Sequence, residues 1–123
     1  MDIQLLLNQA WEEKKEGKFT ESLALYDQVY GELVKEATEH ARAQQGTTED
    51  EGDTRKILPK YFEEADNYLR RDNVVCTILN NMGVIFAELG DKDAARKHFE
   101  ESIKYTPQGM EYENPKVGLK SLE

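Results

Sequence analysis

The chain has 123 residues and a net charge of −9, with 33% charged and 38% hydrophobic residues. This length suits one domain with a modest core, and the composition is typical of a soluble helical protein. The negative charge argues against nucleic acid or an anionic membrane as the partner, and no apolar run reaches the roughly 20 residues that span a membrane. Because Cys76 is the single cysteine, no internal disulfide can form, and we expect a reducing, cytoplasmic location.

The first segment, residues 3–36, has the pattern of two amphipathic helices separated by a glycine turn. Apolar residues recur at helical spacing on both sides of Gly17. They are Ile3, Leu6, Leu7, Ala10 and Trp11 before the turn, and Leu23, Tyr26, Val29 and Leu33 after it. Lys14 and Lys15 precede the glycine, where cations suit the negative end of a helix dipole. The pattern predicts a helical hairpin.

The middle segment, residues 37–73, is less regular. Its first part is helix-prone but poor in apolar residues, and residues 46–53 (GTTEDEGD) are acidic and rich in turn formers. A second apolar stripe follows, made of Ile57, Leu58, Tyr61, Phe62, Ala65, Tyr68 and Leu69. We interpret the segment as a degenerate hairpin with a stretched acidic loop. The alternative is two long helices that flank a linker.

The segment 74–107 predicts another hairpin, with its turn at Gly90. The offset in numbering from Gly17 to Gly90 (90 − 17 = 73) also relates further pairs: Leu5 and Ile78, Leu6 and Leu79, Asn8 and Asn81, Ala10 and Gly83, Ser22 and Ala95, and Tyr26 and Phe99. One offset that relates so many similar residues indicates an internal repeat, and we call it the repeat offset. The first copy departs at Glu13, which replaces Phe86, and at Val34, which replaces Pro107.

One known repeat pattern, W-x₂-L-G-x₂-Y…A-x₃-F…P, matches the spacing of Leu79, Met82, Gly83, Phe86, Gly90, Ala95, Phe99 and Pro107. The chain therefore resembles the tetratricopeptide repeat (TPR) family. The resemblance implies an all-α, TPR-like fold of about three helical hairpins, the middle one degenerate, in a right-handed superhelix with a C-terminal capping helix. The single domain, 1–123, would comprise repeat 1 at 3–36, the degenerate repeat at 37–73 with its acidic loop at 46–53, repeat 3 at 74–107 and the capping helix at 114–122.

Residues able to carry catalysis are few and scattered. His40, His98 and Cys76 fall on different predicted elements. The acids at 49, 50, 51 and 53 lack the 12-residue spacing and terminal glutamate of a calcium loop. No phosphate-binding glycine loop, zinc-ligand spacing or nucleophile motif is present in the sequence. We therefore expect no enzyme activity, no cofactor and no metal site.

The resemblance implies instead a non-catalytic protein–protein interaction module, because the first helix of each TPR lines a concave groove that binds a peptide or a helix. Carried over by position, the groove residues are Gln4, Leu7, Asn8, Trp11 and Lys14 in the first repeat, and Thr77, Asn80, Asn81, Val84 and Glu88 in the last. Asn8 and Asn81 recur at one position, and a side-chain amide both donates to and accepts from a peptide backbone. Trp11 is a natural anchor for a partner. The alternative function is a scaffold that self-associates, for example as a homodimer, through the exposed ends of the stack.

Overall fold

The computed structural model describes the backbone of residues 1–44 and 54–123 and the side chains of residues 1–43 and 61–123. Within these residues the chain forms six α-helices and no strand. The helices are α1 (Ile3–Lys15), α2 (Phe19–Gln44), α3 (Thr54–Leu69), α4 (Val74–Glu88), α5 (Lys92–Lys104) and α6 (Asn114–Ser121). The predicted acidic loop, 46–53, lies outside the described residues.

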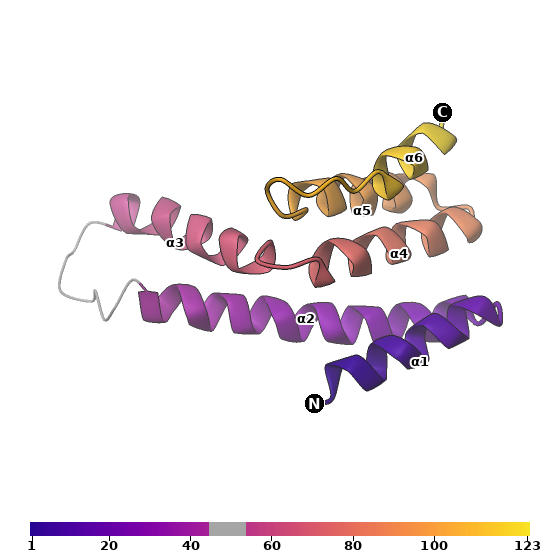
Figure 1. Cartoon of the computed structure of the whole chain (residues 1–123), viewed down its shortest axis with the longest axis horizontal. Helices are drawn as coiled ribbons and strands as arrows, with labels where there is room; N and C mark the ends of the chain where they lie inside the picture. Colours follow the sequence, from indigo (N-terminus) through magenta and orange to yellow (C-terminus); the bar gives the residue numbers. More distant parts are fainter. Residues whose placement is uncertain (45–53) are drawn as a thin grey trace.

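The helix α2 is the central element of the fold. Its 26 residues span about 39 Å at 1.5 Å per residue. It contacts α1 on one side and α3 and α4 on the other, and α3 and α4 lie end to end along it (Figure 1). The helix α5 packs on α4, and α6 packs on α5 and α4. The predicted all-α class built from helical hairpins is confirmed, and α6 lies where the capping helix was expected.

The turns of the two hairpins are built by the same hydrogen bonds. Gly17 and Gly90 both have a left-handed backbone, with φ of 80° and 83°, which glycine adopts without steric cost. In the first turn the Lys18 N–H donates to the Glu13 carbonyl at 2.8 Å, and in the second the Asp91 N–H donates to the Phe86 carbonyl at 2.9 Å. These bonds cap the last carbonyls of α1 and α4. The donors of the two bonds, and likewise their acceptors, are related by the repeat offset.

The helix bounds also follow the repeat offset around the turns, but not at the far end of α2. It relates the ends of α1 and α4, at Lys15 and Glu88, and the starts of α2 and α5, at Phe19 and Lys92. The equivalent of Lys104, where α5 ends, is Gly31, yet α2 continues to Gln44.

The extra length of α2 has a local explanation in the sequence. Pro107 follows the end of α5, and a proline cannot continue a helix because it lacks an N–H donor. Its counterpart on α2, Val34, has that donor. No residue of α2 after Gly31 therefore stops the helix as Pro107 does.

The middle of the chain contains two long helices, α2 and α3, on either side of residues 45–53. The predicted boundary between the first two repeats, 36/37, falls inside α2. The segment 37–44 is the end of α2, and it lies beside α3 rather than forming a separate helix. The division of the chain into three repeats therefore remains a prediction. The bounds of α2 and α3 resemble the alternative, in which two long helices flank a linker.

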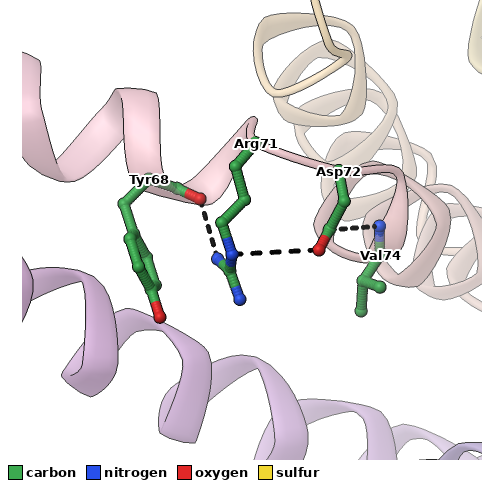
Figure 2. A network of polar contacts seen from close by, with 4 residues as sticks. All are labelled: Tyr68, Arg71, Asp72 and Val74. Carbon is green, nitrogen blue, oxygen red and sulfur yellow. Dashed lines mark hydrogen bonds and ion pairs between the residues drawn. The ribbon is translucent and has the colours of Figure 1, made fainter.

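A small polar network fixes the junction between α3 and α4 (Figure 2). The Arg71 guanidinium lies 3.8 Å above the ring of Tyr68, and its Nη1 donates to the Tyr68 carbonyl at 2.8 Å. The neighbouring Asp72 accepts a hydrogen bond from the Val74 N–H at 3.0 Å, which satisfies a free amide at the start of α4. Arg71 and Asp72 also form an ion pair at 3.8 Å. These contacts set the break between the two helices.

A second polar contact ties α3 to the end of α5. The Tyr105 hydroxyl donates to the Asp66 carboxylate at 3.1 Å, and the Lys104 ammonium lies 3.6 Å from the other carboxylate oxygen. Burial, together with the negative charge of Asp66, raises the pKa of Tyr105 to about 12. The hydroxyl therefore stays protonated at neutral pH and can donate to the carboxylate.

Phe99 is closely packed, and its side chain is 1% exposed. A Cβ atom added to Gly83 of α4 would lie 2.7 Å from the Phe99 ring, and one added to Gly118 of α6 would lie 2.5 Å from it. Real Cβ atoms do not approach a neighbour this closely. The Phe99 ring is therefore held between two glycines, one on each neighbouring helix.

We predict that Gly83→Ala destabilises the protein by about 1–3 kcal/mol, because the methyl group would overpack against Phe99. Helix propensity alone would give the opposite sign, since alanine is favoured over glycine in a helix by about 1 kcal/mol. Gly31→Ala in α2 is the matched control, because an added Cβ meets no atom within 4 Å there. Urea titration of both variants checks this. Equal stabilisation by both changes would show that Gly83 is not needed for packing.

Candidate functional site

The five predicted groove residues of α1 form one open face of that helix. Gln4 donates its side-chain amide to the Asn8 amide oxygen at 3.0 Å, and both side chains are exposed. Trp11 is 43% exposed, and the Lys14 ammonium lies 4.8 Å from the centre of its ring. Leu7 is half-buried beside them. All the polar contacts named here are made within α1, so this face is available to a partner.

The predicted groove residues of α4 are used differently. Asn81 donates to the Tyr26 hydroxyl of α2 at 3.2 Å, and Thr77 donates to the carbonyl of Asn73 at 2.6 Å. Asn80 is only 5% exposed, and its amide oxygen has no hydrogen-bond partner among the described residues. Val84 is half-buried, and Glu88 is exposed in the last turn of α4. Asn80 is buried and Asn81 bonds a neighbouring helix, so these two residues contribute to the interior of the protein.

None of the contacts described above links the predicted groove residues of α1 to those of α4. The α1 residues contact one another, whereas Asn81 links α4 to α2. Asn8 and Asn81 share a repeat position but make different contacts, because Asn81 bonds α2 whereas Asn8 accepts a hydrogen bond from Gln4 within α1. The sequence does contain a signal for the hydrogen bond of Asn81, because Tyr26 carries a hydroxyl where the other copy has Phe99.

Charges near the Trp11 face are distributed unevenly. Lys15 pairs with Glu12 at 3.0 Å, and Lys18 pairs with Glu16 at 3.1 Å. Lys14, by contrast, forms no ion pair with any carboxylate of the described residues, and it contacts the Trp11 ring instead. A cation above an aromatic face is attracted by the ring electrons, typically by about 0.5–1 kcal/mol at an exposed site. The contact restrains both side chains.

The residues with catalytic potential lie apart from each other. His40 packs on Tyr68 with ring centres 4.6 Å apart, and His98 packs on Phe86 at 4.8 Å. Burial raises the pKa of the Cys76 thiol, which keeps it protonated and unreactive. In the described part of the chain, no group of three or more histidine, cysteine or acidic residues has the arrangement of a metal site. The acids at 49–53, considered above for calcium, lie outside the described residues.

None of the described helices is both long enough and apolar enough to cross a membrane.

We predict that Asn81→Ala and Asn8→Ala differ in their effect on stability. Asn81→Ala removes a hydrogen bond between two helices and should cost about 1 kcal/mol. Asn8→Ala removes an exposed contact within one helix and should change stability by less than about 0.5 kcal/mol. Guanidinium unfolding of the two variants provides the comparison. A larger loss for Asn8→Ala than for Asn81→Ala would contradict the assignment of Asn81 to the interior.

Comparison with known proteins gives one result that agrees with the geometry. Residues 76–108 match the family model described as tetratricopeptide repeat, and this segment spans nearly all of α4, the Gly90 turn and all of α5. No curated protein and no solved structure matches the chain significantly. Proteins of this family are in general protein–protein interaction modules and are typically non-catalytic. The resemblance seen in the sequence is thereby confirmed for residues 76–108, which match a tetratricopeptide repeat.

Proposed function

We propose that this protein binds an extended or helical segment of a partner protein in the concave groove predicted from the sequence, with the open face of α1 as the main contact. That face consists of Gln4, Leu7, Asn8, Trp11 and Lys14. The observation that carries the proposal is the exposure of Trp11, a large aromatic side chain that remains 43% accessible in a small acidic protein. Thr77, Val84 and Glu88 of α4 would extend the same surface.

The chemistry of the α1 face suits a peptide. An exposed indole that contacts a lysine loses little further freedom on binding, and tryptophan is enriched among residues that dominate interface energy. The Asn8 and Gln4 amides supply both donors and acceptors for a peptide backbone. The proposal therefore places an apolar partner side chain on Trp11 and the partner backbone along Asn8.

The composition of the N-terminal end of the stack supports groove binding over end-to-end self-association. In α4 the buried apolar residues include Ile78, Met82 and Ile85. At the repeat offset, α1 has Leu5, Gln9 and Glu12, all exposed. Two of these three are polar, so this end is a poor surface for stacking another copy.

We further propose a cytoplasmic location and a partner that is a protein rather than nucleic acid or a membrane. The support is the single, buried cysteine and the net charge of −9, which disfavours polyanions.

The test starts from a random peptide library displayed on mRNA and selected on the folded chain. For the best selected peptide, Trp11→Ala should weaken binding by at least about thirtyfold, or about 2 kcal/mol. Phe62→Ala is the matched control, because Phe62 on α3 is also an exposed aromatic, at 59%. Calorimetry gives both affinities, and circular dichroism verifies folding. Unchanged affinity in folded Trp11→Ala would refute the α1 site.

A light-scattering measurement on the same protein separates the two functions. A monomer that binds the selected peptide supports the groove. A stable dimer whose formation excludes the peptide would favour the scaffold function.

A further inference from the structure

A groove of about 420 Å³ lies between α2 and α5, over the helix α4 that both of them contact. Its floor is apolar: Met82 is buried there, and the half-buried ring of Phe86 lies beside it. The wall on the α2 side includes Leu23 and the short side chain of Ala24. Ala24 and Phe86 both line the groove, and the Ala24 side chain is a single methyl group. It involves none of the residues of the α1 face.

The rim of the groove presents hydrogen-bond acceptors. The Asp27 carboxylate lies on the α2 side, and it forms no ion pair with a cation of the described residues. On the α5 side, His98 Nδ1 lies 2.7 Å from the Ala94 carbonyl. A carbonyl only accepts, so Nδ1 carries the proton in this contact, and in that tautomer Nε2 is an acceptor. The Thr20 hydroxyl adds a third group that accepts.

The composition of this wall is unusual for a solvated helix face, as the second copy shows. At the repeat offset, the four α2 residues Thr20, Leu23, Ala24 and Asp27 correspond to Asp93, Arg96, Lys97 and Glu100 of α5. All four of the α5 residues are charged and exposed, as expected for a solvated face. On α2 only Asp27 keeps a charge. The difference leaves one carboxylate, without an ion pair among the described residues, beside an apolar groove.

We propose that this groove is a second docking surface, which takes a partner segment with an arginine next to a large apolar side chain. The apolar side chain would fill the space above Met82 and Phe86. The guanidinium has only donors and therefore complements a rim of acceptors, with Asp27 as its counter-charge. Its planar shape also suits stacking on the rings of Phe86 and His98, which a lysine cannot do equally well.

The first experiment uses acetyl-Leu-Arg-amide as the probe and compares it with acetyl-Leu-citrulline-amide, its neutral isostere. Titration followed by ¹⁵N–¹H NMR should give a dissociation constant on the order of 1 mM for the arginine probe. The citrulline probe should bind at least about fivefold more weakly, and shifts should gather on α2, α4 and α5. Equal affinity for the two probes, shifts confined to α1, or no binding of either probe would overturn the proposal.

Two pairs of variants locate the interaction. Asp27→Asn should bring the ratio of the two affinities to about one, whereas Glu39→Gln, an exposed acid elsewhere on α2, should preserve it. Ala24→Trp should fill the groove and abolish binding, while Ala43→Trp, at another exposed alanine of α2, should not. Both substitutions are at exposed positions of α2, and tryptophan is compatible with a helix, so the helical circular dichroism signal should be unchanged. A ratio that persists in Asp27→Asn, or binding that survives Ala24→Trp, would contradict the proposed site.

Discussion

The ring of Phe99 between Gly83 and Gly118 is the constraint on which the second half of the structure depends. An added Cβ would lie 2.7 Å or less from the ring at either glycine. The two helices can approach α5 to this distance only because both positions lack a side chain. This packing holds α4 and α6 against one aromatic ring, and His98, the neighbour of Phe99 on α5, reaches the rim of the α2–α5 groove.

The first hairpin has different residues at the positions equivalent to Gly83 and Phe99. Ala10 and Tyr26 replace Gly83 and Phe99, and Ser22 donates to the Ala10 carbonyl at 2.7 Å where the other copy has Ala95. The larger tyrosine also carries a hydroxyl, and Asn81 donates to it across the boundary between the hairpins. This hydrogen bond adds to the apolar core that the two hairpins share, which includes Val29 of α2 and Ile78 of α4. The face of α1 that carries Asn8 is exposed in the described structure.

Much of the fold could be predicted from the sequence because glycine turns and helical periodicity are local signals. Gly17 and Gly90 located the turns of both hairpins. The length of α2 was harder to predict. A glycine such as Gly31 does not end a helix by itself, and no proline follows it within α2.

The parts that could not be predicted depend on packing between helices. The roles of Asn80 and Asn81 depend on which helices pack against α4, and periodicity does not specify that. The α2–α5 groove is hidden for the same reason, because its floor comes from α4 and its walls from α2 and α5. These segments are far apart in the sequence, and only the fold brings them together.

A double-mutant cycle between Phe99 and Gly118 tests the central claim most directly. Gly118→Ala, Phe99→Leu and the double variant would be unfolded in urea and compared with the natural chain. If the ring is held between the two glycines, Phe99→Leu makes room for the new methyl group. The cost of Gly118→Ala should then fall by at least about 1 kcal/mol in the Phe99→Leu background. Additive costs, within about 0.3 kcal/mol, would show that Gly118 and Phe99 do not constrain each other.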